Sequence, residues 1–138
     1  MSALVLDASV AVAWFMPEEL TANVQSVGEQ VSDEGAVVPN LWPLEVTNIL
    51  LRAESTKRIS KQDRALAIGE LARLRIEIDT ETAMCAWDAT FDLASRFRLT
   101  TYDACYLELA QRRQLPLATL DRELRAAGRK LGIELLGA

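Results

Sequence analysis

The chain contains no histidine, and this absence excludes several kinds of catalytic site. A serine or cysteine nucleophile cannot be paired with histidine here, and a zinc site with histidine ligands cannot be built. A ribonuclease that works with two histidines is excluded for the same reason. Hydrolysis by this chain would therefore depend on carboxylates and a bound metal ion.

Cysteine and long apolar runs are also scarce. Cys85 and Cys105 are the two cysteines, and both fall within helical patterns, where we expect them to fill space in or near the core. Two thiols alone cannot make a zinc site. The longest apolar run near the N-terminus, residues 8–16, is too short to span a bilayer and follows Asp7 rather than a basic segment. We therefore expect no membrane partner, no signal peptide and a cytoplasmic location.

Positive charge is in short supply, because the formal net charge is −5. A nucleic-acid-binding protein usually carries a basic face, so the balance alone argues against that class. Net charge, however, governs solubility and association rather than the chemistry of a site. A cluster of buried acids would account for most of the excess, and bound metal ions would reverse its sign locally.

Short apolar strands alternate with helices along the whole chain. At 138 residues, with no linker, low-complexity tract or repeat, the chain is expected to form one domain over residues 1–138. The alternation predicts a parallel sheet covered on both faces, an α/β fold of the three-layer α/β/α type with about five strands. The predicted strands are 3–6, 36–38, 76–78, 116–119 and 133–135, and the predicted helices are 8–15, 18–31, 44–54, 61–74, 81–97, 102–113 and one that ends at Gly128.

Four acidic residues stand where a strand or a turn leads into a helix. They are Asp7 in Leu-Val-Leu-Asp-Ala-Ser, Glu45 in Trp-Pro-Leu-Glu-Val, Asp103 in Thr-Thr-Tyr-Asp-Ala and Asp121 in Leu-Ala-Thr-Leu-Asp. The carboxyl ends of parallel strands share one edge of a sheet, and ligands bind in the crevice there. Converging carboxylates repel one another unless a divalent cation joins them. The pattern predicts a hard-metal site.

Helix capping is the strongest competing explanation of these acids. Asp7 and Asp121 stand at N-cap positions, and Glu45 and Asp103 fall in first turns, where an acidic side chain contributes roughly 0.5–1 kcal/mol. Threonine would serve as a cap at several of these places. The repeated use of a full carboxylate indicates that the negative charge itself is required.

A carboxylate site of this kind suits phosphodiester chemistry. Carboxylate oxygens and water are the ligands that Mg²⁺ and Mn²⁺ prefer. Two such ions about 4 Å apart can polarise a phosphodiester, lower the pKa of an attacking water and stabilise the leaving oxygen. No side-chain base is required, which agrees with a chain that lacks histidine.

The other acidic and apolar residues have simpler interpretations. Asp88 and Asp92 are one turn apart on a predicted helix and are typical of a solvated face, as is Glu123 beside Arg122 and Arg125. A further set of apolar residues is expected in the core, with a groove for a partner helix as the alternative. This set is Trp14, Phe15, Trp42 and Leu51.

The ordered set of four motifs resembles the PIN-domain ribonucleases, and among them the VapC-type toxins of toxin–antitoxin pairs. The motifs are Val-Leu-Asp-Ala-Ser-Val, Pro43-Leu-Glu-Val-Thr-Asn-Ile-Leu50, Thr101-Tyr-Asp-Ala-Cys-Tyr-Leu-Glu-Leu-Ala110 and Pro116-Leu-Ala-Thr-Leu-Asp121. They cover essentially the whole chain in the family's order. Each motif alone is unspecific, but the ordered set is specific.

This resemblance implies an α/β/α fold, dependence on Mg²⁺ or Mn²⁺, and endonucleolytic cleavage of RNA. It also implies a homodimer and a VapB-type antitoxin whose C-terminal segment covers the active site. By position, Asp7, Glu45, Asp103 and Asp121 would be the catalytic, metal-binding acids. Thr119, Asn48 and Ser9 would make supporting contacts, and Arg52, Arg98 and Arg122 are candidates for contacts with RNA.

Two other functions are compatible with the residues. A phosphatase with Asp7 as nucleophile usually has a second acid two residues later, where this chain has Ser9. A trapped phospho-aspartate would favour that enzyme. A protein-binding module with a vestigial site is the second alternative, and the intact acids at all four positions argue against it.

Overall fold

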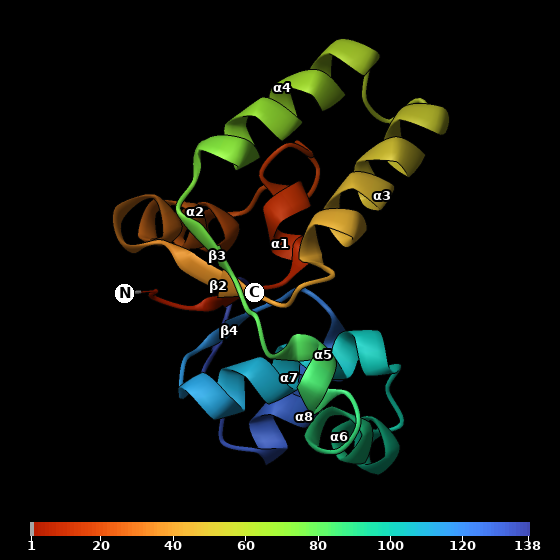
Figure 1. The fold of residues 1–138 in the computed structure, drawn as a ribbon. Helices are drawn as coiled ribbons and strands as arrows, with labels where there is room; N and C mark the ends of the chain where they lie inside the picture. The colour runs from red at the N-terminus through yellow and green to blue at the C-terminus, as the bar shows by residue number, and fades with distance from the viewer. Residues whose placement is uncertain (1) are drawn as a thin grey trace.

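Five parallel strands form a single sheet at the centre of the molecule (Figure 1). The structure is a computed structural model that describes residues 2–138. The strands lie in the order β3-β2-β1-β4-β5, so β1 is central, with β2 on one side and β4 on the other. Their bounds are β1 Val5–Leu6, β2 Ala36–Val38, β3 Ile76–Ile78, β4 Leu117–Ala118 and β5 Leu135–Leu136.

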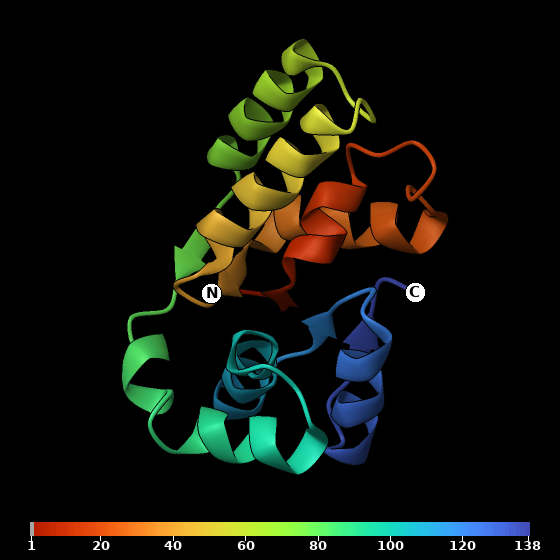
Figure 2. The ribbon, with the colours of Figure 1, turned by 90° about the vertical axis from the view of Figure 1, so that its right-hand side faces the viewer.

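Helices cover both faces of the sheet. The first four helices lie on one face and the last four on the other, as both ribbon views show (Figures 1 and 2). The predicted three-layer α/β/α fold with a parallel sheet of five strands is therefore confirmed. The helices are α1 Ala8–Ala13, α2 Ala22–Glu34, α3 Trp42–Ser55, α4 Lys61–Arg73, α5 Thr82–Cys85, α6 Ala89–Phe97, α7 Thr101–Arg113 and α8 Arg122–Lys130.

The order of the strands reverses direction next to β1. The chain builds β1, β2 and β3 towards one edge and then returns to place β4 on the other side of β1. A parallel sheet opens a crevice at such a switch point, outside the carboxyl ends of the strands. The segments that follow β1 and β4 therefore flank the crevice, and these segments begin with Asp7 and contain Asp121.

Two predicted helices were wrong in extent. The predicted helix 18–31 begins later, at Ala22, because the Thr21 hydroxyl accepts a hydrogen bond from the Val24 amide at 3.2 Å. The predicted helix 81–97 is divided into α5 and α6. Asp88 has a non-helical backbone (φ −138°, ψ −80°) and its carboxylate caps the first amide of α6, so the side chain competes with the helix it was expected to continue.

One predicted core residue was also wrong. Trp42 is buried, and Trp14 and Phe15 pack partly buried against the core. Leu51, in contrast, is 60% exposed on α3. Both thiols are free. Cys105 is buried, and burial raises its pKa to about 11, whereas Cys85 is only partly buried. Within residues 2–138, no helix is both long enough and apolar enough to cross a membrane.

Candidate metal centre at the carboxyl edge of the sheet

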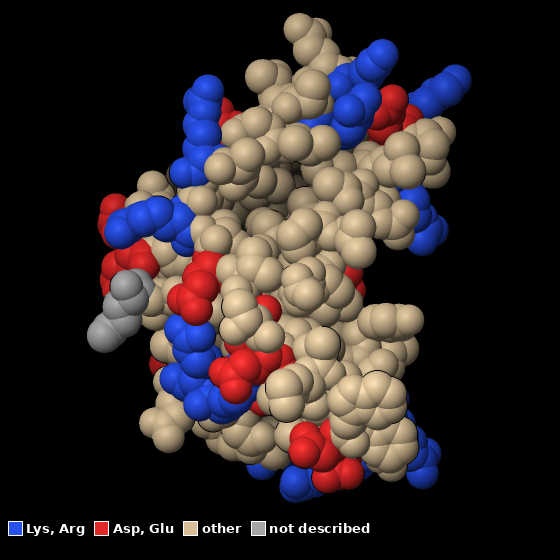
Figure 3. All heavy atoms as spheres, viewed as in Figure 1, with Lys and Arg blue, Asp and Glu red and all other residues tan. Residues whose placement is uncertain are grey.

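Asp7 lies directly after β1, at the carboxyl edge of the sheet. The surface is notched on the right of Figure 3, between α3 and the helices of the other face. The Asp7 residue is only 7% exposed. The Ser9 and Thr119 hydroxyls both donate to Oδ2, each at 2.7 Å. Two neighbouring hydroxyls thus stabilise a carboxylate that burial would otherwise make costly.

The same two hydroxyls join the segments after β1 and β4. Ser9 Oγ accepts from the Leu120 amide at 3.1 Å, and Thr119 Oγ1 accepts from the Asp121 amide at 3.0 Å. Because each hydroxyl also donates to Asp7, the position of the loop that carries Asp121 is fixed relative to Asp7. The predicted supporting residues Ser9 and Thr119 therefore contact the acids directly.

Glu45 approaches from the first turn of α3. The Tyr106 hydroxyl, on α7, donates a hydrogen bond to Glu45 Oε1. Tyr106 is fully buried and stands three residues after Asp103, on the same face of α7. The tyrosine thereby fixes the Glu45 carboxylate relative to the helix that carries Asp103.

Capping explains only one of the four acids. Asp121 accepts from the Leu124 amide at 2.9 Å and is a true N-cap of α8. Asp7 stands at the N-cap position of α1 but makes no side-chain cap hydrogen bond. The cap of α7 is Thr100, which accepts from the Asp103 amide at 3.1 Å. Asp7, Glu45 and Asp103 thus make no side-chain cap hydrogen bond, although Glu45 and Asp103 do lie in first turns, where the helix dipole favours an acid.

The pKa shifts of the acids indicate that their carboxylates lie near one another. Burial is the largest cause that raises the pKa of Asp7, and the charge of Asp121 adds to it against the two hydroxyl hydrogen bonds. Burial also raises the pKa of Glu45, helped by the charges of Asp7 and Asp103, while the Tyr106 hydrogen bond lowers it. Burial and the charges of Asp121 and Asp7 raise the pKa of Asp103. The negative charges of these carboxylates therefore repel one another.

The carboxylates do not form a closed cage of metal ligands. Among residues 2–138, no three Asp, Glu or Cys side chains already stand close enough together to enclose a metal ion. Mg²⁺ does not need such a cage, because it keeps several waters and binds proteins through one or two carboxylates. Hard oxygen donors of negative charge therefore fit a divalent cation in type.

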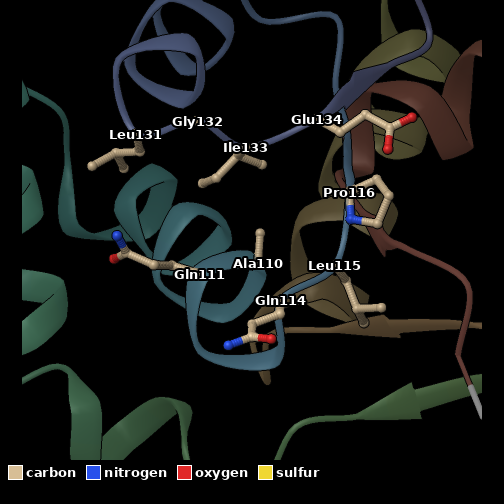
Figure 4. A pocket seen from close by; sticks show the side chains of 9 residues that line it. All are labelled: Ala110, Gln111, Gln114, Leu115, Pro116, Leu131, Gly132, Ile133 and Glu134. Atoms are coloured by element: carbon tan, nitrogen blue, oxygen red, sulfur yellow. The ribbon is translucent and has the colours of Figure 1, made fainter.

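The third predicted supporting residue, Asn48, does not join this group. It is exposed on α3 and lines a pocket against α4, together with Leu44, Leu51 and Ile68. None of the hydrogen bonds within residues 2–138 connects Asn48 to the four acids. A second pocket, between α7 and the segment that precedes β5, lies at the amino edge of the sheet (Figure 4). Its single acid is Glu134, so this pocket does not contribute to the acidic site.

Sequence reasoning missed a buried ion cluster around Arg112, in the last turn of α7. Arg112 donates to both oxygens of Asp79, at 2.8 and 3.0 Å, and to both oxygens of Glu108, also at 2.8 and 3.0 Å. Thr82 also donates to Asp79 and accepts from the Asn40 amide, in the loop that precedes α3. The cluster thus joins α7 to the segments after β2 and β3. The only signal in the sequence was Asp79 itself, which follows a strand as Asp7 does.

Known proteins match this chain both in sequence and in fold. The model of the PIN domain family matches residues 4–130. Ribonuclease VapC3 of Pyrobaculum aerophilum is 27% identical over 121 residues, which are 88% of this chain and 91% of the relative.

Solved structures share the fold at low identity. The Pyrobaculum aerophilum protein PAE2754 has a TM-score of 0.71 at 21% identity, over 97% of this chain and 83% of its own. VapBC2 from Rickettsia felis, bound to a DNA fragment from their promoter, has a TM-score of 0.66 at 11% identity over 96% of each chain. FitAcB from Neisseria gonorrhoeae has a TM-score of 0.64 at 14% identity, over 96% of this chain and 95% of its own.

Proposed function

The chain belongs to the PIN domain family, and from this premise we propose that it is a ribonuclease that depends on Mg²⁺ or Mn²⁺ and cleaves RNA internally. The family resemblance predicted from the four motifs is confirmed by the match over residues 4–130. One observation supports the activity most directly. Three buried or half-buried carboxylates that make no side-chain cap hydrogen bond lie at the carboxyl edge of the sheet, near the topological switch point and the loop that carries Asp121.

The four acids would hold the cation, and the chain's other residues would orient them. A bound Mg²⁺ or Mn²⁺ would supply a Lewis acid for the phosphate and lower the pKa of a water. Ser9 and Thr119 hold Asp7 Oδ2, and Tyr106 holds Glu45 Oε1, so two carboxylates are positioned before any ligand arrives. Without a cation, the negative charges of the four carboxylates would repel a phosphodiester. Binding of RNA and of metal should therefore be coupled.

Cleavage of RNA by the purified chain tests this function. We expect cleavage of a labelled unstructured RNA with millimolar Mn²⁺ or Mg²⁺ and none with a chelator. The metal should also stabilise the protein in the absence of RNA, by about 1.4 kcal/mol at ten times its dissociation constant, through mass action. A protein that shows neither cleavage nor a thermal shift across both metals would leave the vestigial-module alternative as the better account. A trapped phospho-aspartate at Asp7 would instead identify the phosphatase.

Tyr106→Phe tests whether the tyrosine positions Glu45. The substitution removes the hydroxyl from a fully buried ring without opening a cavity, and a hydrogen bond to a charged group contributes about 1.5–3 kcal/mol. We expect weaker Mn²⁺ binding by calorimetry, by roughly tenfold as for other partners that orient a ligand. Tyr102→Phe, on an exposed side chain of the same helix, is the matched control. Equal metal affinity in both variants would contradict the positioning role.

The proposed biological role is that of a toxin neutralised by an antitoxin. This role is supported by the VapC relative and by the apolar pocket between α3 and α4, lined by Leu44, Leu51 and Ile68, next to the turn that carries Glu45. An antitoxin segment that covers the acids would use this surface, and the toxin would act as a homodimer. The test is hydrogen exchange in the complex. If α3 remained unprotected when the partner inhibits cleavage, the proposed covering segment would be wrong.

A further inference from the structure

Positive charges without an acidic partner are unevenly distributed over this acidic chain. The chain has 15 Lys and Arg residues. Salt bridges occupy Arg58, Arg64, Arg112 and Arg113, and Arg75 and Arg125 donate to backbone carbonyls. The other cations make no ion pair within residues 2–138 and form two groups. The first group lies on α3, α4 and the loop between them, which we call the α3–α4 arm, and consists of Arg52, Lys57, Lys61 and Arg73. The second group lies at the end of α6 and on α8 and consists of Arg96, Arg98, Arg122, Arg129 and Lys130.

The second group surrounds a pocket between the C-terminal end of α6 and α8. We call it the basic pocket; its volume is about 390 Å³. Arg96, Arg98 and Lys130 line it with a single acid, Glu123, while Phe97 contributes apolar surface. The Arg96 guanidinium lies over the Phe97 ring, with Cζ 4.9 Å from the ring centre. Three positive charges thus face one negative charge, in a chain whose net charge is −5.

The basic pocket adjoins the acidic site. Arg98 ends α6, and the short connection to α7 leads to Asp103 in the first turn. Glu123, which lines the basic pocket, lies in the first turn of α8, two residues after Asp121. Figure 2 shows the C-terminal end of α6 beside α8, below α7, which is seen nearly end-on. A polyanion in the crevice would therefore reach the basic pocket without leaving this side of the molecule.

We propose that the basic pocket binds phosphate groups of the RNA strand next to the bond that is cleaved. This inference rests on the proposed function. The acidic crevice can accept one phosphate by way of a cation, but it offers no attraction to the rest of the sugar–phosphate backbone. Lys and Arg that neutralise phosphates release counterions and supply most of the sequence-independent affinity for nucleic acid. The basic pocket supplies three such groups, Arg96, Arg98 and Lys130, against a single acid, Glu123.

The test compares two triple substitutions of equal charge. The first is Arg96→Gln, Arg98→Gln and Lys130→Gln in the basic pocket. The second is Lys57→Gln, Lys61→Gln and Arg73→Gln on the α3–α4 arm, where all three side chains are exposed. The control is matched in backbone as well, because Arg98 and Lys57 both have a left-handed backbone, with φ of 57° and 63°. Each variant removes three positive charges, so a general effect of net charge is the same in both.

Binding is measured with a cleavage-deficient background, Asp7→Asn, and a fluorescent single-stranded RNA at several salt concentrations. We expect the basic-pocket variant to reduce the slope of log affinity against log salt by about 2, since each phosphate contact on a single strand contributes about 0.7. At about 0.1 M salt this corresponds to a loss of up to roughly a hundredfold in affinity. The arm variant should bind as the background does.

The outcomes separate this inference from the proposed function. If the parent protein cleaves RNA and the two triple variants bind equally, the basic pocket has no role and the nuclease stands. If the parent protein never cleaves RNA, the nuclease fails, and the difference in salt slope still decides whether the pocket binds RNA. If the triple basic-pocket variant binds RNA as tightly as the background but no longer binds an acidic protein, the pocket is a protein-binding site and the proposal is overturned. Should the triple variant fold poorly, Arg96→Gln alone carries the same test, with an expected slope change of about 0.7.

Discussion

Asp7→Asn is expected to abolish RNA cleavage and, at the same time, to stabilise the metal-free protein. The Asp7 carboxylate is buried, and burial raises its pKa, so its charge opposes folding at neutral pH. Asparagine keeps the shape and an oxygen that can accept from Ser9 and Thr119, whose hydroxyls both donate to one atom of the carboxylate. We expect a gain of about 1 kcal/mol in unfolding free energy without metal.

The loss of activity has a different cause from the gain in stability. Asparagine offers a neutral oxygen where a cation requires a negative one, so cleavage should fall by about a thousandfold or more. Chemical denaturation with a chelator and a cleavage assay with Mn²⁺ measure the two effects separately. Glu29→Gln, an exposed acid on α2, is the control for removing one negative charge and should change neither quantity. A marked loss of stability in metal-free Asp7→Asn would instead favour the capping explanation.

Arg112→Met is expected to destabilise the fold by about 3 kcal/mol, the largest effect that we expect from a single substitution outside the acidic site. Arg112 makes paired hydrogen bonds to Asp79, which is 3% exposed, and to Glu108, which is 5% exposed. Methionine retains much of the apolar contact but leaves both buried carboxylates without a cation. A melting temperature lower by roughly 10 °C would follow for a chain of this size.

The stability that Arg112→Met loses should depend on pH, in a direction set by the pKa of Asp79. Burial raises the pKa of Asp79, but the hydrogen bonds and charge of Arg112, with the Thr82 hydroxyl, outweigh burial and lower the pKa below its usual 3.8. A carboxyl with a lowered pKa stabilises the fold above its unfolded pKa, and this stabilisation is lost as pH falls through the folded value. The difference between parent and variant should therefore be full at pH 7 and shrink as pH approaches 3.8 and below.

The neighbouring arginine provides the control. Arg113 pairs with Glu77, whose side chain is 51% exposed, at 3.0 Å. An exposed pair of this kind contributes little, so Arg113→Met should cost no more than about 1 kcal/mol. Equal losses in the two variants would mean that burial of the Arg112 cluster is not what stabilises the fold.

The sequence by itself determined the fold class and the position of the acids along it. Short apolar runs followed by helical patterns imply parallel strands, and an acid placed directly after such a run must lie at the carboxyl edge of the sheet. This local rule places Asp7 and Asp121 and, through the first turns of α3 and α7, Glu45 and Asp103. It failed where side chains compete with the backbone, as at Asp88, and where an apolar residue faces outwards, as at Leu51.

Only the tertiary structure decided which groups surround those acids. The Tyr106 hydroxyl reaches Glu45 across 61 positions of sequence, and Thr119 reaches Asp7 across 112. The Arg112 cluster likewise joins α7 to the segments that follow β2 and β3. Contacts of this kind arise when the sheet brings α3, α7 and the segment after β4 together, because the strand order, and not distance along the chain, determines which segments become neighbours. No periodicity or local spacing encodes that order.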